Sequence, residues 1–155
     1  DVLARHGFRC YRGPDPTWYG SFKRPLKRAA HYLDDLLALP PPTVLPRRDG
    51  PLWDIPGSVM LQGMDGPRGW IPAACRTRRC IAGLERAARR REIFHLWFHP
   101  INFSVGMERM LRALEPALAR AANLRAEGKL EVLTMGALAE RLSASEARSK
   151  RVCAG

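Results

Sequence analysis

The stretch I-F-H-L-W-F-H-P, residues 93–100, decides how the rest of this sequence is interpreted. It is apolar and aromatic, and it ends at Pro100, which cannot donate a backbone hydrogen bond to a sheet. Arg-rich sequence of helical character precedes it, and a long helical pattern follows within a few residues. This context predicts a buried strand over residues 93–98, with His99 emerging where the chain turns.

Helical and strand-like segments alternate along the chain. Apolar residues at three- and four-residue spacings predict helices over residues 23–39, 79–91, 105–126 and 135–142. Short apolar runs predict strands over residues 7–12, 93–98 and 130–133, with further extended segments at 44–45 and 52–55. The alternation predicts an α/β fold with parallel strands. Reactive groups in such folds collect at the C-terminal ends of the strands, where Arg12 and His99 stand here.

The predicted helices carry details that a structure can test. The first has an apolar stripe made of Leu26, Ala29, Ala30, Leu33, Leu36 and Leu37. Pro116 lies inside the third helix, so we expect a kink or a division there. Thr134 is the expected cap of the last helix, and the polar residues 143–155 after it are expected to form a disordered tail.

The two histidines of the opening stretch cannot share a metal ion if the stretch is a strand. On a helix, His95 and His99 would lie side by side, as zinc ligands do. On a strand they share a face but stand ~13 Å apart, four steps of roughly 3.3 Å. We therefore predict that His95 is a hydrogen-bonded core residue. His99, at the strand end, is either a structural residue or a general acid or base.

Other candidate residues have a functional and a structural interpretation. Arg12, at the exit of the first predicted strand, can hold a carboxylate for catalysis or simply form a salt bridge. Trp53 can stack on a sugar ring or fill the core, and Asp54 beside it offers a carboxylate. His6 and His31 belong to no constellation, so we expect both at the surface.

Composition limits the class of protein. The chain has 155 residues, 46% of them hydrophobic, which is enough for one domain with a core, and it contains no apolar run long enough for a transmembrane helix. Its net charge is +11, but the arginines are dispersed and not interleaved with aromatic residues, so specific nucleic-acid binding is not expected. The four cysteines (Cys10, Cys75, Cys80 and Cys153) form no zinc motif and are expected to be reduced thiols, which favours a cytoplasmic location.

Three motifs resemble the C-terminal half of a polysaccharide deacetylase domain. F-R-C-Y-R-G-P at residues 8–14 is similar to the family's R-x-P motif, and L-W-F-H-P at 96–100 to its late leucine-to-histidine motif. Residues 130–142, with T-M-G-A-L-A-E-R-L, resemble its last βα unit. The resemblance implies that residues 1–142 are the C-terminal part of a distorted, incomplete (β/α) barrel.

The resemblance also implies an activity. Family members remove N-acetyl groups from amino sugars or act on related C–N bonds, and a divalent metal, usually zinc, activates water together with an aspartate base. His99 would be the general acid and Arg12 would orient the aspartate, although Arg9 could also be the motif arginine. Trp53, Asp54 and Tyr11 would contact an amino-sugar glycan, but the family's spelling D-x-x-D-W is absent.

The family's metal and base motifs are not found ahead of the R-x-P strand. The T-F-D-D-like motif and the metal-binding H-x-x-x-H pair both belong upstream of it, so we expect them outside this chain, along with the zinc ligands. On this interpretation the chain alone neither holds zinc nor deacetylates a substrate. Two alternatives stay open. One is a non-catalytic carbohydrate-binding relative that stacks sugars on tryptophans (Trp18, Trp53, Trp70 and Trp97), and the other is a basic nucleic-acid-binding module.

Overall fold

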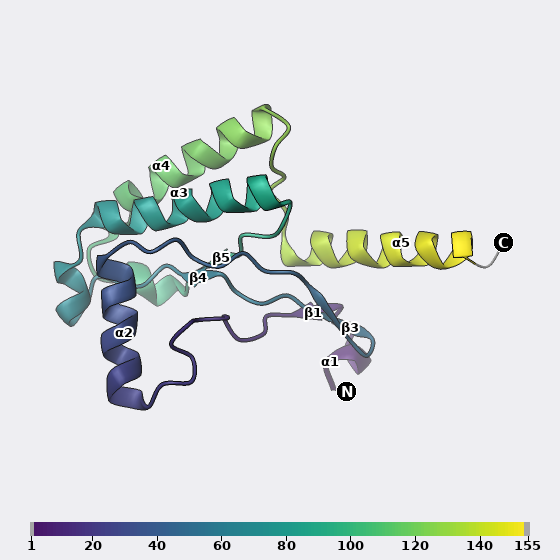
Figure 1. The fold of residues 1–155 in the computed structure, drawn as a ribbon, viewed down its shortest axis with the longest axis horizontal. Coiled ribbons are helices and arrows are strands. Elements are labelled where there is room, and N and C mark those ends of the chain that lie inside the picture. The colour runs from purple at the N-terminus through teal and green to yellow at the C-terminus, as the bar shows by residue number, and fades with distance from the viewer. Residues whose placement is uncertain (1, 154–155) are drawn as a thin grey trace.

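The computed structural model describes residues 2–153 and has a mixed α/β architecture (Figure 1). The helices are α1 (Val2–Arg5), α2 (Arg24–Leu36), α3 (Ala73–Arg90), α4 (Met107–Ala126) and α5 (Met135–Cys153), with two 3₁₀ helices, η1 (Gly66–Trp70) and η2 (Pro100–Phe103). The strands are β1 (Cys10–Tyr11), β2 (Arg47–Asp49), β3 (Leu52–Asp54), β4 (Val59–Met60) and β5 (Leu96–Trp97). Mixed α/β structure is therefore confirmed.

The strands form two small sheets with parallel pairs in each. β1 runs parallel to β3, with Cys10 opposite Trp53, and β2 pairs antiparallel with the other edge of β3. β4 runs parallel to β5, with Val59 opposite Leu96. Residues 130–133 are not a strand: no described strand pairs with them, and Val132 is 63% exposed. A strand needs a neighbour to satisfy its backbone, so an apolar run alone does not make one.

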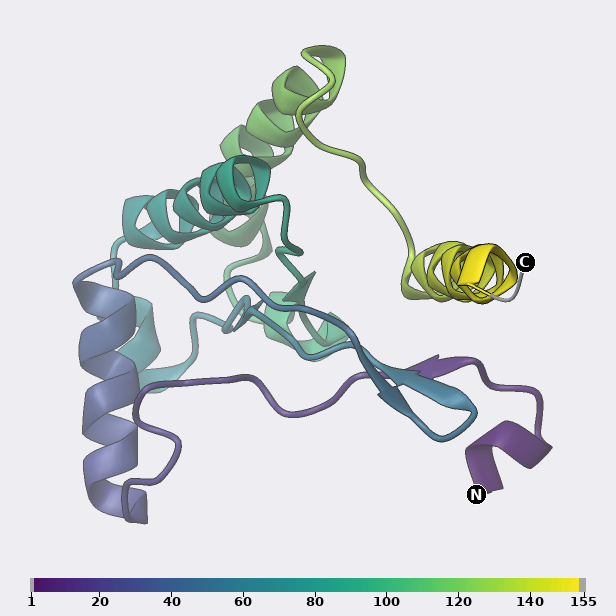
Figure 2. The same ribbon diagram turned by 45° about the vertical axis from the view of Figure 1, so that its right-hand side comes forward.

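The main core lies between the strands and the helix pair α3 and α4, which lie side by side in both ribbon views (Figures 1 and 2). Its buried members are Leu61, Met64, Cys80, Met110, Leu114 and Ala117. α3 begins at Ala73, ahead of the predicted start at residue 79, because Arg76 and Arg79 on its first turns are buried and paired. Arg76 donates to the backbone oxygens of Ile71 and Gly63, at 2.9 and 3.2 Å.

The structure decides two details of the predicted helices. α4 runs through Pro116 as one helix, so of the predicted kink or division, the division does not occur. α5 continues to Cys153, so the predicted disordered tail is helical as far as the structure describes it, and residues 154–155 lie outside the described part. Glu146 stabilises this extension, because it accepts from Lys150 one turn later at 2.8 Å and also lies 3.6 Å from Arg48.

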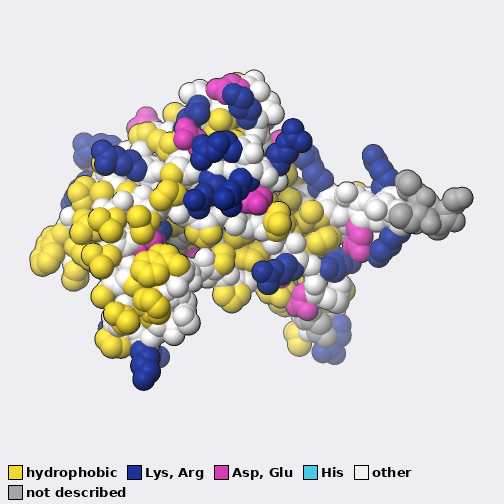
Figure 3. Space-filling view, in the orientation of Figure 1, with side chains coloured by type: hydrophobic (Ala, Val, Ile, Leu, Met, Phe, Trp, Pro, Cys, Tyr) yellow, Lys and Arg dark blue, Asp and Glu magenta, His cyan; other side chains and the backbone are white. Residues whose placement is uncertain are grey.

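The apolar stripe of α2 is mostly exposed. Leu26, Leu33 and Leu37 are 58%, 50% and 64% exposed, whereas Ala30 and Asp34 are buried. Figure 3 shows hydrophobic side chains gathered over α2 and the neighbouring end of the molecule, with Lys and Arg spread over α3 and α4. α2 therefore directs a polar side chain inward, because Asp34 has a buried cationic partner in Arg79.

Candidate functional site

The C-terminal ends of β1 and β5 meet at the indole ring of Trp97. The guanidinium carbon of Arg12, which follows β1, lies 3.5 Å from the centre of this ring. The imidazole of His99, which follows β5, contacts the same indole edge-on, with ring centres 5.3 Å apart and planes at 85°. The two residues predicted to be catalytic therefore lie against one aromatic side chain.

Asp15 completes this cluster, and the sequence-based prediction missed it. Its carboxylate accepts from Arg12 Nη1 at 3.3 Å and from Trp97 Nε1 at 3.1 Å. The side chains of Arg12 and Asp15 are 33% and 19% exposed, so the ion pair is partly shielded from water. The sequence feature that could have identified Asp15 is its position in the loop, three residues after Arg12 and between two prolines. We call Arg12, Asp15, Trp97 and His99 the indole cluster.

Gly57 makes room for the indole cluster. A methyl group on its Cα would overlap the carboxylate of Asp15 and lie 2.6 Å from Trp97 Nε1, so both side chains pack directly on this glycine. The loop that joins β3 to β4 thus forms the floor of the cluster. Glycine is needed here for close approach of side chains to the backbone.

His99 is held by Asn102 at the start of η2. Its amide N–H donates to Asn102 Oδ1 at 2.7 Å, and its carbonyl accepts from the Asn102 amide at 2.9 Å, at the start of η2. The residue is exposed. An imidazole exposed at a strand end can donate or accept a proton.

His95 is the hydrogen-bonded residue that was predicted. Its Nδ1 lies 3.0 Å from the carbonyl oxygen of Pro56, its amide donates to Ser58 Oγ at 3.0 Å, and it is half-buried. Among the described residues no group of three or more His, Cys, Asp and Glu side chains is arranged to hold a metal ion. The indole cluster offers one carboxylate, already paired with Arg12, and one imidazole, so these residues do not fit a zinc site.

Tyr11 and Trp53, predicted to bind substrate, contact other parts of the molecule. The hydroxyl of Tyr11 donates to Asp49 Oδ2 at 2.7 Å, and this hydrogen bond raises the pKa of Tyr11 to about 12. The indole of Trp53 donates to Ser143 Oγ of α5 at 2.9 Å and lies 5.0 Å from the Arg48 guanidinium. In the described part of the chain, neither side chain forms a hydrogen bond or ring contact with the indole cluster.

Asp54 and the alternative arginine also have defined places. The Oδ1 atom of Asp54 is buried without a hydrogen-bond partner among the described residues, and it packs directly on Gly13 next to Arg12. A buried carboxylate oxygen without a partner is costly, so this atom is a candidate acceptor for a donor from a ligand or another segment. Arg9 pairs instead with Glu140 of α5 at 2.7 Å, so Arg12 is the arginine that reaches the cluster.

His31, expected at the surface, lies in a second polar network beside the cluster. Its side chain is 30% exposed, Nδ1 is 2.5 Å from the hydroxyl of Tyr19, and Nε2 is 3.1 Å from the Gln62 amide nitrogen. Burial, with Arg79 and Arg68, lowers the pKa of His31, so the ring is neutral at neutral pH. Sequence gave no signal for this network because its members come from separate segments.

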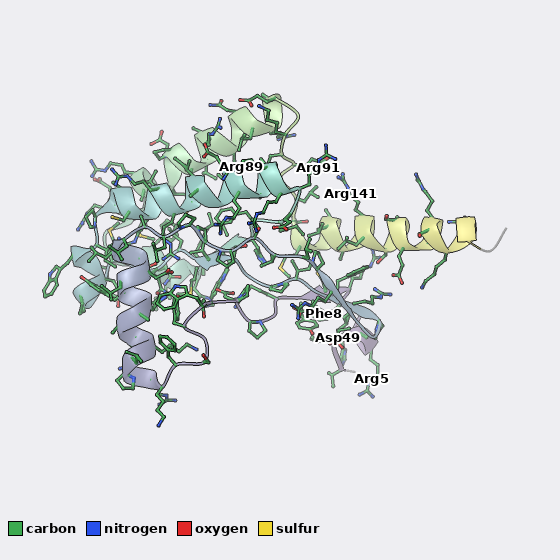
Figure 4. The ribbon with its side chains drawn as sticks, viewed as in Figure 1. Arg5, Phe8, Asp49, Arg89, Arg91 and Arg141 are labelled. Carbon is green, nitrogen blue, oxygen red and sulfur yellow. The ribbon has the colours of Figure 1, made fainter. Side chains whose placement is uncertain are left out.

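The remaining surface and the cysteines add little chemistry. Figure 4 shows Arg89, Arg91 and Arg141 around the end of α3 and the start of α5. Cys10, Cys75 and Cys80 are free thiols, while the side chain of Cys153 lies outside the described part. Among the described helices none has the length and apolar character to cross a membrane.

No family model, curated protein or solved structure matches this chain.

Proposed function

We propose that this chain forms part of a metal-dependent hydrolase that removes an N-acyl group from an amino sugar of a glycan, on an incomplete (β/α) barrel of parallel strands. The observation that supports the proposal is that Arg12 and His99 both contact the Trp97 indole. Arg12 follows β1, which runs parallel to β3, and His99 follows β5, which runs parallel to β4. The motifs F-R-C-Y-R-G-P and L-W-F-H-P that carry the resemblance to polysaccharide deacetylases contribute these same two residues.

In this proposal His99 is the general acid. Water adds to the carbonyl carbon of the N-acyl group, the C–N bond breaks, and the leaving nitrogen takes a proton from the His99 imidazolium to depart as an amine. His99 suits this step because its backbone is fixed by Asn102 while its ring is exposed. Trp97 positions the ring by its edge-on contact.

Arg12 is the positioning residue for a carboxylate in this proposal. Its guanidinium is held between Asp15 and the indole face of Trp97, which leaves donor groups that can pair with a second carboxylate. Among the described residues no group of three or more His, Cys, Asp and Glu side chains is arranged to hold a metal ion. The proposal therefore requires another segment to supply the metal ligands, and the base with them.

The test is turnover by a protein that carries this chain together with a segment supplying the base and metal motifs. His99→Ala is expected to lower kcat on an N-acetylated chitooligosaccharide by about 10²–10⁴-fold, the usual contribution of a general acid. Metal content, measured by elemental analysis, should not change. His6→Ala is the matched control, because His6 is exposed and lies ahead of β1, at the opposite end of that strand from Arg12. Unchanged turnover in His99→Ala would exclude the role.

A non-catalytic carbohydrate-binding protein is the second candidate function. This alternative is favoured by the position of Trp18 and Trp97, two of the chain's four tryptophans, which line the same cavity. Glycan binding by the complete protein with no release of acetate would decide for this alternative.

A further inference from the structure

A cavity of about 330 Å³ opens beside the indole cluster and has not been assigned a role. The loop from β1 to α2 runs across to the lower end of α2 (Figure 2), and this loop, α2 and the β4 region enclose the cavity. Asp15 and Trp97 belong both to its lining and to the indole cluster. Its volume lies in the range of small-molecule sites. A ligand in it can therefore contact two residues of the indole cluster, Asp15 and Trp97.

The Gln62 side-chain amide sets the directions of the hydrogen bonds that link Gln62, His31 and Tyr19 in the cavity wall. The Gln62 amide nitrogen can only donate, so His31 Nε2, 3.1 Å away, must accept. A neutral His31 then carries its proton on Nδ1 and donates to the hydroxyl oxygen of Tyr19 at 2.5 Å. Tyr19 keeps its proton, because burial and Asp34 raise its pKa to about 12. The Tyr19 O–H is thus left as a donor.

Gln62, which lines the cavity, also has an unused acceptor. Its Oε1 atom is buried and has no hydrogen-bond partner among the described residues. A buried acceptor without a partner destabilises the fold, and a hydrogen bond from a ligand hydroxyl can remove that cost. One donor at Tyr19 and one acceptor at Gln62 match a hydroxyl group, which both donates and accepts.

The charged groups that line the cavity balance in number, and the central pair is buried. Asp34 accepts from Arg79 Nη2 at 2.6 Å and from Trp18 Nε1 at 3.0 Å, and both Asp34 and Arg79 are 6% exposed. The lining carries two carboxylates, Asp15 and Asp34, and two guanidinium groups, Arg79 and Arg86. Balanced charge favours a neutral ligand over a phosphate or an amine.

Trp18 is the aromatic residue available for stacking. It is 58% exposed and is steadied by edge-on contacts with Tyr19 and Phe22, with ring centres 5.1 and 5.7 Å apart, and by its bond to Asp34. Trp97 is not equally available, because Arg12 covers one face of it. An exposed, fixed indole next to hydroxyl-binding groups is typical of sugar recognition.

The geometry points to this cavity as a subsite for one neutral pyranose ring, held by Trp18, Tyr19 and Gln62 beside the reacting group. The proposal rests on the proposed function for the identity of the ligand, an N-acetylated hexosamine. Tyr19 and Gln62 hold its hydroxyl groups, and Trp18 contacts its apolar face. The chemistry itself belongs to His99 and Arg12.

Saturation-transfer NMR on the 155-residue chain tests the subsite, with N-acetylglucosamine methyl glycoside as the probe. We expect saturable binding that inorganic phosphate does not displace. Tyr19→Phe, which removes only a hydroxyl, is expected to weaken binding about 10-fold, the worth of one hydrogen bond. Trp18→Ala should weaken it at least as much. Trp70→Ala is the control, because Trp70 is 80% exposed and not part of the lining.

Each outcome separates the subsite from the hydrolase proposal. No binding by the folded wild-type chain, displacement by phosphate, or equal losses in Trp18→Ala and Trp70→Ala would overturn the subsite. In the complete enzyme, Tyr19→Phe should raise KM with little change in kcat. If acetate is released but Tyr19→Phe leaves KM unchanged, the subsite is wrong and the hydrolase proposal stands. If the sugar binds as expected but no protein containing the chain releases acetate, the hydrolase proposal is wrong.

Discussion

The indole nitrogen of Trp97 lies 3.1 Å from the Oδ2 atom of Asp15, and this hydrogen bond joins β5 to the loop that follows β1. Asp15 uses its other carboxylate oxygen to hold Arg12. The bond therefore couples the strand that carries His99 to the residue that would orient a partner carboxylate.

Trp97→Phe keeps an aromatic ring in place and removes the donor to Asp15. We expect unfolding to become easier by about 1–2 kcal/mol, since a hydrogen bond to a charged, partly buried acceptor is lost. Urea denaturation measures the change. Trp53→Phe is the control because it removes an indole donor at an exposed hydrogen bond to Ser143. If both variants lose the same free energy of unfolding, the hydrogen bond from Trp97 to Asp15 does not stabilise the fold more than an exposed one does.

Gly57→Ala should disturb the indole cluster directly. The added methyl group overlaps the Asp15 carboxylate, so we expect a destabilisation of about 1–3 kcal/mol, as for other overpacked positions. Thermal unfolding followed by circular dichroism gives the measurement. Gly136→Ala is the matched control, since its nearest neighbour would be Thr134 Oγ1 at 3.9 Å, in a helix where Ala is favoured. A neutral Gly57→Ala would show that Asp15 does not depend on this floor.

Arg79→Met should destabilise the fold severely. Arg79 pairs with Asp34 and Asp35, and its removal leaves two carboxylates without their cation, one of them 6% exposed. Breaking a buried pair in this way costs about 3–5 kcal/mol. Arg89→Met is the control, because the Arg89 side chain is 70% exposed, and we expect a change within about 0.5 kcal/mol. Chemical denaturation of both variants side by side decides the matter.

His31 should make the stability of the fold depend on pH. Its pKa in the folded state lies below the ordinary value of 6.5, so on acidification the unfolded chain binds this proton first. The free energy of unfolding should therefore fall as pH drops below 6.5, and level off once pH passes below the lowered folded-state pKa. Above pH 6.5 the contribution is fully present.

His31→Gln should remove this part of the pH dependence. The free energies of unfolding of the wild type and the variant are compared by denaturant unfolding at several pH values between 7 and 5. A difference of one pKa unit between the folded and unfolded states corresponds to about 1.36 kcal/mol. His6→Gln, at an exposed position, should keep the wild-type slope. If the slope survives in His31→Gln, another group is responsible for it.

Local pattern was sufficient for the elements with strong periodicity. The apolar spacing of α3 and α4 located both helices, and the position of His95 inside an aromatic run identified it as a hydrogen-bonded residue, as observed. Boundaries were less well predicted. α3 begins earlier than predicted because buried arginines of its first turns form hydrogen bonds, as Arg76 does with the carbonyl oxygen of Ile71. Residues 130–133 have no neighbouring strand in the described part of the chain. Neither feature can be predicted from a local sequence pattern.

The sequence alone was enough to predict that Arg12 and His99 follow strand-like segments, and that His95 on a strand is too far from His99 to share a metal ion with it. The packing of the chain, in contrast, was needed to show that Asp15 and Trp97 join the two strand ends, and that His31 and Asp34 turn inward beside them. The physical reason is that strand and helix periods are local properties. Hydrogen bonds between distant side chains depend on how the segments pack, and packing brings residues 15, 34, 79 and 97 to one cavity wall.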